Sequence, residues 1–177
     1  MKRLIPILFF FLATSLYGDP ADDWSVEIIP SGITKEAKII VADFNDPYFF
    51  VILTNKTDHI LKVWKQWCSW GFFTLSFTVK QEDGNSFTLK RLNGAWTWNY
   101  PDATIVYPGK CFVLQATIAK KGSGVFEGFP PKFRDGKTTI QAHFTIKEDA
   151  ETKKHGVWTG SVSSVPESID IKKSLYD

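Results

Sequence analysis

The sequence predicts an all-β domain, a sandwich or a barrel, on three observations. Apolar and polar residues alternate with a period of two along most of the chain, and helical periodicity is nearly absent. The alternating runs are short and recur at intervals of about 8–12 residues, with turn residues between them. No linker or shift in composition divides the chain, so a single domain is expected.

The clearest pair of strands flanks Asp83 and Gly84. Residues 73–80 and 86–91 each carry an apolar side chain at every second position, beginning with Phe73 in the first run. Glycine tolerates the positive φ of a tight turn, so an Asp-Gly pair between two alternating runs predicts a β-hairpin.

The other strands follow from the same pattern. Residues 48–53 are apolar on both faces, which is typical of a central strand. The tail, residues 172–177, is polar and is expected to fray. About nine or ten strands are predicted in all, the remaining ones at residues 24–29, 37–41, 61–64, 112–118, 140–147, 157–162 and 168–171.

Residues 1–18 are predicted to be a cleavable secretion signal. Lys2 and Arg3 give a positive start, an apolar run follows, and small and then acidic residues complete the signal-peptide order. The apolar run, residues 4–16, is shorter than the roughly 20 residues that cross a bilayer as a helix. An uncleaved anchor or an apolar N-terminal strand is the alternative. We expect a secreted or periplasmic protein whose mature domain, residues 19–177, has no stable membrane span.

The charge balance argues against nucleic-acid binding. The chain has 21 Lys and Arg against 19 Asp and Glu. Both extra cations, Lys2 and Arg3, belong to the predicted signal, so the mature domain has equal numbers of each sign. A neutral surface of mixed charge provides no long-range attraction to phosphate backbones or anionic lipid.

The chain has two cysteines, Cys68 and Cys111, and an exported protein meets oxidising conditions. We predict a disulfide between them. The alternative is two separately buried thiols that pack as small apolar residues.

Four segments carry a resemblance to a fold family. They are Phe49–Asn55 (FFVILTN), Trp70–Phe77 (WGFFTLSF), Tyr107–Gly109 (YPG) and Val157–Ile171 (VWTGSVSSVPESIDI). With these segments the chain resembles the immunoglobulin-like β-sandwiches of small exported bacterial proteins, and faintly the BsuPI-type proteinase-inhibitor sandwiches. The resemblance implies two antiparallel sheets and carries over no functional residues.

The chain departs from the antibody pattern around its cysteines. Trp70 lies only two residues after Cys68, and Gly109 stands where a Tyr is expected two positions before the second cysteine. A bridge placed differently from the antibody disulfide is therefore expected.

The tryptophans are the strongest functional signal, because seven in a chain of this length is a high number. Exposed indole rings provide stacking surfaces for sugar rings or anchors for a protein partner. We select Trp67, Trp96 and Trp98 as candidate binding residues because they lie near turns. The alternative is that they fill the core, which is the expectation for Trp70 and Trp158.

A second candidate region is the stretch from Lys120 to Lys137, which is rich in glycine and phenylalanine. Long loops without secondary structure are uncommon in compact domains and are often functional. Phe126 and Phe129 are therefore candidate binding residues. The alternative is a connection between the sheets whose phenylalanines cap the open end of the core.

No motif commits the chain to a metal, a cofactor or a reaction. The histidines, His59, His143 and His155, lack paired-ligand spacing, so neither a metal site nor a cofactor is predicted, and His143 is expected to be solvated. A Gly-x-Ser-x-Gly nucleophile elbow is missing from the sequence. Asn55 begins an Asn-x-Thr glycosylation acceptor, which matters only in a eukaryotic host.

Three classes of function follow. The first choice is a non-catalytic exported binding or interaction module for a protein or carbohydrate partner, of which a proteinase inhibitor is one version. The second is a periplasmic enzyme or metal-handling protein whose site is assembled from distant residues. The third is a structural component of an envelope assembly.

Overall fold

The computed structural model describes residues 20–42, 48–91, 99–118, 126–127 and 136–173. Thirteen strands lie within these ranges, more than the sequence predicts. They are β1 (Trp24–Ile29), β2 (Gly32–Ile33), β3 (Lys38–Ala42), β4 (Phe49–Asn55), β5 (Leu61–Trp64), β6 (Leu75–Gln81), β7 (Ser86–Arg91), β8 (Ala103–Val106), β9 (Cys111–Ala116), β10 (Phe126–Glu127), β11 (Gly136–Ile146), β12 (Gly160–Ser163) and β13 (Glu167–Lys173).

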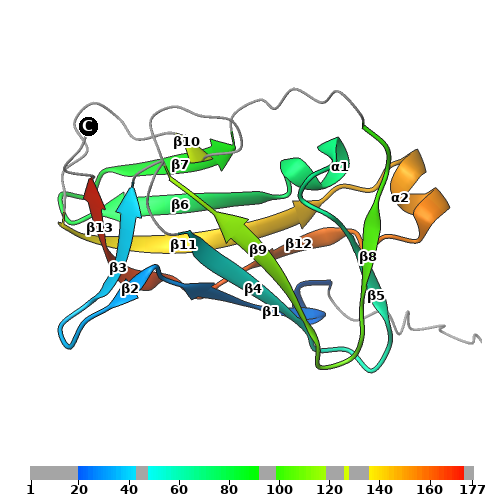
Figure 1. The fold of residues 1–177 in the computed structure, drawn as a ribbon, viewed down its shortest axis with the longest axis horizontal. Helices are drawn as coiled ribbons and strands as arrows, with labels where there is room; N and C mark the ends of the chain where they lie inside the picture. The colour runs from blue at the N-terminus through cyan, green and yellow to red at the C-terminus, as the bar shows by residue number, and fades with distance from the viewer. Residues whose placement is uncertain (1–19, 43–47, 92–98, 119–125, 128–135, 174–177) are drawn as a thin grey trace, which may run out of the picture.

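The strands form an immunoglobulin-like sandwich, which confirms the predicted fold class (Figure 1). A three-stranded sheet has the order β1-β4-β9, and an eight-stranded sheet has the order β10-β7-β6-β11-β13-β3-β2, with β12 paired to β11. These orders contain the A-B-E and C′-C-F-G arrangements of the immunoglobulin fold. Neighbouring strands are antiparallel except β13 and β3, which pair in parallel. The short strands β5 and β8 form a separate antiparallel pair.

The core lies between the two sheets and is rich in aromatic rings. Phe49 of β4 contacts Phe77 of β6, with ring centroids 5.3 Å apart. Trp158 stacks on Phe144 of β11 and meets Trp24 of β1 edge to face. The predicted core position of Trp158 is therefore confirmed. Its indole N–H also donates to Asp23 at 2.8 Å, which satisfies its one polar group.

Two sequence predictions are confirmed by the strand pairing. β6 and β7 form the predicted hairpin, and Gly84 in its turn has a φ of +87°, a conformation that favours glycine. β4 lies between β1 and β9, as its apolar sequence predicts.

The predicted strand from Phe73 onward begins too early. A single helical turn, α1 (Ser69–Phe72), precedes it, and the strand begins at Leu75. Gly71 permits this turn, because a Cβ there would lie 2.1 Å from the main-chain oxygen of Lys65. The turn shifts Phe73 out of the strand register and leaves its side chain 51% exposed.

A second helix, α2 (Ala150–His155), was not predicted, and the strand expected from Val157 begins only at Gly160. Asp149 caps α2 by accepting a hydrogen bond from the Thr152 N–H, and Thr152 bonds back to the Asp149 N–H. Gly156 ends the helix in the left-handed conformation. A short 3-10 turn, η1 (Pro20–Asp22), precedes β1.

Candidate functional site

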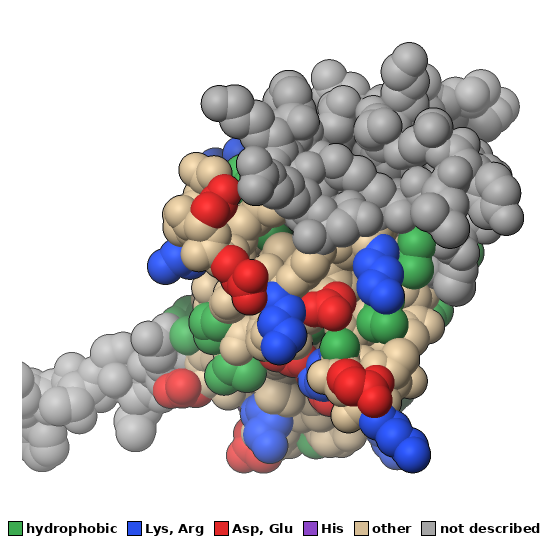
Figure 2. Space-filling view, turned by 90° about the vertical axis from the view of Figure 1, so that its left-hand side faces the viewer, with side chains coloured by type: hydrophobic (Ala, Val, Ile, Leu, Met, Phe, Trp, Pro, Cys, Tyr) green, Lys and Arg blue, Asp and Glu red, His purple; other side chains and the backbone are tan. Residues whose placement is uncertain are grey.

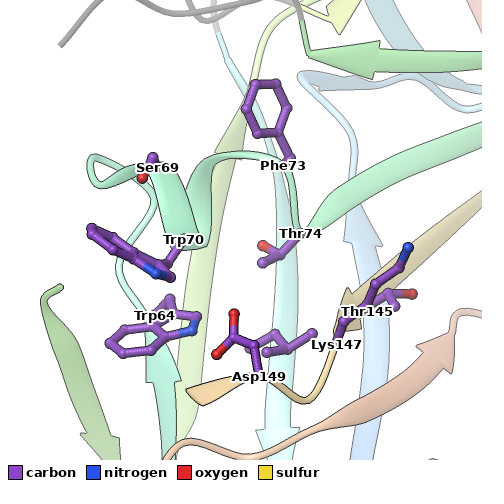
Figure 3. A pocket seen from close by; sticks show the side chains of 9 residues that line it. Trp64, Ser69, Trp70, Phe73, Thr74, Thr145, Lys147 and Asp149 are labelled. Atoms are coloured by element: carbon purple, nitrogen blue, oxygen red, sulfur yellow. The ribbon is translucent and has the colours of Figure 1, made fainter. Parts of the chain in front are cut away.

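α1 and the segment leading into α2 enclose a cavity of about 480 Å³, here called the aromatic pocket (Figure 3). A volume in the range of about 300–1,000 Å³ is typical of small-ligand sites. β5, α1, the residues after α1, the end of β11 and the connection to α2 all contribute. Its lining residues are Trp64, Ser69, Trp70, Phe73, Thr74, Thr145, Ile146, Lys147 and Asp149.

One side of the aromatic pocket is built from indole rings. The ring centroids of Trp64 and Trp70 lie 6.1 Å apart at an angle of 43°. Trp64 is 1% exposed and packs edge to face against the ring of His155, with the two ring centroids 5.4 Å apart. Trp70 is half-buried, so the expectation of a pure core residue is corrected: it packs against the core and also lines the pocket. Trp70 therefore packs against an indole ring that is itself buried.

The other side of the pocket is polar. In Figure 3, Thr74 and Asp149 lie between the indoles and a pair formed by Thr145 and Lys147. The main chains of Thr74 and Thr145 are joined by a 2.8 Å hydrogen bond, which fixes the spacing of this side.

The two ions of the pocket are only partly engaged within the protein. Asp149 uses Oδ1 for the α2 cap at 2.7 Å. Its Oδ2 and the Lys147 ammonium make no hydrogen bond or ion pair within the described ranges. Both residues are exposed, so these atoms are open to a ligand or to water.

Trp67 is the one predicted binding tryptophan whose position the structure describes. It is 43% exposed and meets Tyr100 edge to face, with centroids 4.9 Å apart. Trp67 does not line the pocket. Asn99, the residue before Tyr100, accepts a hydrogen bond from the Ser69 N–H and donates one to the Ser69 hydroxyl. These bonds keep Trp67 and Tyr100 beside α1. Trp96, Trp98 and Phe129 lie outside the described residues.

Phe126 does not lie on the surface, which corrects its prediction as a binding residue. It is 0% exposed, contacts Phe77, and has the guanidinium of Arg91 5.1 Å from its ring centroid. The same guanidinium lies 5.0 Å from the ring of Phe72 and donates to the carbonyl of Gln115 at 2.9 Å. Burial lowers the pKa of Arg91 to about 10. Phe126 therefore belongs to a buried contact between the sheets, as the alternative for its loop expects.

The predicted disulfide is absent, because Cys68 and Cys111 are both free thiols. Cys68 is buried at the start of α1, with Sγ 3.7 Å from the carbonyl of Asp102. Cys111 is exposed at the start of β9, with Sγ 3.3 Å from Thr54 Oγ1. Cys68 thus lies near the Ala103 end of the β5–β8 pair and Cys111 near its Val106 end, and a four-residue strand is about 13 Å long. A disulfide needs Cα atoms within about 7 Å.

The Asn-x-Thr sequence has a structural role. The turn between β4 and β5, residues 55–60, is here called the Asn55 turn. Asn55 is 1% exposed; its Nδ2 donates to the carbonyls of His59 and Val106, and its Oδ1 accepts from Thr57 N and Oγ1. Because both amide hydrogens are engaged and enclosed, the side chain is not accessible as a glycosylation acceptor in the folded protein.

The histidines lie apart from one another. His59 belongs to the Asn55 turn and His155 to α2. His143 is half-buried rather than solvated: its Nε2 and Nδ1 lie 2.8 Å and 2.7 Å from the hydroxyls of Thr78 and Ser163, and burial lowers its pKa below the ordinary 6.5. Among the described residues, no three His, Cys, Asp or Glu side chains group as metal ligands would.

Positive and negative side chains are interspersed on the end of the sandwich seen in Figure 2. Within the sheet, Lys38 of β3 and Glu167 of β13 form an ion pair of 2.6 Å. None of the helices that the structure describes has the length and apolar character needed to cross a membrane.

Sequence reasoning found the aromatic content of this region but not the pocket. The pocket depends on α1, whose single turn has no periodic signal. The start of α2 could have been found from the Asp-x-x-Thr cap and its end from the glycine that follows it, Gly156. Comparison of the chain with protein-family models, with curated proteins and with solved structures gives no match.

Proposed function

We propose that the mature chain, residues 19–177, is an exported, non-catalytic binding module whose ligand enters the aromatic pocket. The observation that carries the proposal is the pairing of an indole side, Trp64 and Trp70, with a polar side whose Asp149 and Lys147 keep unengaged atoms. Ligand sites combine an apolar surface with a few orienting polar groups in this way. Export is supported by the charge, apolar run and small residues of the first 18 positions.

The partner is a protein or a carbohydrate, because both use exposed aromatic rings as anchors. Trp67 and Tyr100, beside α1, extend the aromatic surface outside the pocket.

Ligand-observed NMR with a library of small ring compounds tests the site. We expect hits whose binding is lost in Trp70→Ala and retained in the matched Trp67→Ala variant, since only Trp70 lines the pocket. Hits that bind both variants equally would place the ligand elsewhere and overturn the proposal, as would a library without hits. Export is tested by the intact mass of the protein recovered from the periplasm, which should lack the first 18 residues.

A further inference from the structure

The charges in the aromatic pocket restrict the chemistry of its ligand. Its lining contains one carboxylate, Asp149, and one ammonium, Lys147. The two opposite charges leave the lining with no net charge, so neither a simple cation nor a simple anion gains a net Coulombic attraction there. The pocket therefore favours an uncharged ligand.

The unengaged atoms restrict it further. Asp149 Oδ2 is an acceptor, the Lys147 ammonium has three donors, and the hydroxyls of Ser69 and Thr145 can do both. A ligand that satisfies them must carry several groups that both donate and accept. A hydroxyl group donates and accepts at one oxygen atom, whereas an amide divides these roles between its nitrogen and its oxygen and an ether oxygen only accepts.

The indole side adds the requirement of an apolar face. Trp70 presents a half-buried ring opposite the polar groups (Figure 3). A molecule that fits has C–H groups on one face and hydroxyl groups around its edge. A sugar ring has this form.

Three main-chain N–H groups of the pocket lining, those of Ser69, Thr74 and Thr145, are used within the protein and are closed to an extended peptide. The Thr145 N–H already donates to the Thr74 carbonyl at 2.8 Å. The groups identified above as unengaged, Asp149 Oδ2 and the Lys147 ammonium, belong to side chains, whereas peptide strands bind chiefly through main-chain hydrogen bonds. Of the two partner classes, the pocket thus favours the carbohydrate.

We infer that the aromatic pocket binds an uncharged pyranose ring, stacked on Trp70 and hydrogen-bonded to Asp149 and Lys147. This inference rests on the proposed function and names the ligand class of the same site.

The test follows the indole N–H cross-peaks of the ¹⁵N-labelled mature protein during titrations. The probes are methyl glycosides of glucose, galactose, mannose and N-acetylglucosamine, then choline as a cation and glucuronate as an anion. We expect at least one glycoside to shift the Trp70 cross-peak at millimolar concentration and to leave that of Trp67 in place. Choline and glucuronate should shift neither.

Variants assign the contacts. Trp70→Ala should abolish the glycoside response, measured by saturation transfer to the sugar. Asp149→Asn should weaken it about tenfold, since asparagine retains the helix cap but lacks the charge that strengthens hydrogen bonds. Lys147→Gln should weaken it in the same direction, and Trp67→Ala should leave it unchanged.

The outcomes separate the two proposals. Choline or glucuronate shifting Trp70 while every glycoside fails would overturn the sugar and leave the pocket as a binding site. If only compounds of the ring library bind, the sugar is likewise overturned and the pocket remains a binding site. Failure of all probes and of the library at Trp70 would overturn both. A glycoside that binds equally well to Trp70→Ala would refute the stacking contact.

Discussion

The two ends of the β5–β8 pair differ in whether their polar side chains are hydrogen-bonded within the protein. At the end near Val106, the Asn55 turn satisfies all four hydrogen-bonding positions of a buried amide within the protein. At the end near Ala103, the aromatic pocket leaves Asp149 Oδ2 and the Lys147 ammonium open to solvent. Buried polar groups must be paired internally, whereas a ligand site needs groups that still have bonding capacity. The first end maintains the fold, and the second is available for binding.

The largest difference between the two ends is expected when the asparagine at each end is replaced by alanine. Asn55→Ala removes four hydrogen bonds of a buried amide, including the one to the Val106 carbonyl, so we expect it to lower the free energy of unfolding by about 3 kcal/mol or more. Asn99→Ala also removes a hydrogen bond to the main chain and one to the Ser69 hydroxyl, but Asn99 is exposed and water replaces them. Its cost should be about 1 kcal/mol or less. Urea denaturation measures both, and equal losses would contradict the comparison.

At the end of the β5–β8 pair that carries the aromatic pocket, the position of α1 requires a glycine at residue 71. An alanine Cβ would meet the main-chain oxygen of Lys65 at 2.1 Å, so α1 must move away from the end of β5. We expect Gly71→Ala to lower the free energy of unfolding by about 2–3 kcal/mol. The matched control is Gly32→Ala, where the nearest atom is the Cβ of Ile39 at an ordinary 3.9 Å. Similar denaturation midpoints for the two variants would show that α1 is not held where the structure places it.

Gly71 and Asn55 also show which parts of the structure can be predicted from the sequence and which cannot. The strands follow from period-two alternation, so the sandwich and the β6–β7 hairpin were predictable. The close approach of Gly71 to Lys65 is a contact in space that no local pattern encodes. The pocket depends on it and was missed for that reason. The Asn-x-Thr motif predicts a glycosylation acceptor from three neighbouring residues, whereas the Val106 carbonyl that Asn55 binds is distant in sequence.

A smaller effect is expected when an indole of the pocket is removed. Trp70 is half-buried and lies at the edge of the core, so Trp70→Ala should lower the free energy of unfolding by about 1 kcal/mol. Trp158→Ala should cost about 3–5 kcal/mol, because that ring stacks within the core and its N–H binds Asp23. Thermal and urea denaturation compare them. If Trp70→Ala proves as costly as Trp158→Ala, Trp70 supports the fold rather than a ligand.

The smallest effect, none, is expected from a reducing agent. Each end of the β5–β8 pair holds one cysteine: Cys111 beside the Asn55 turn and Cys68 at the start of α1. A thiol reductant should therefore leave the melting temperature unchanged, whereas a broken disulfide would cost about 2–5 kcal/mol. Iodoacetamide should modify Cys111 in the native protein and Cys68 only after unfolding, because Cys68 is buried and Cys111 is exposed. Protection of both thiols until reduction would mean that the two ends are covalently joined, and the independence on which the comparison rests would be lost.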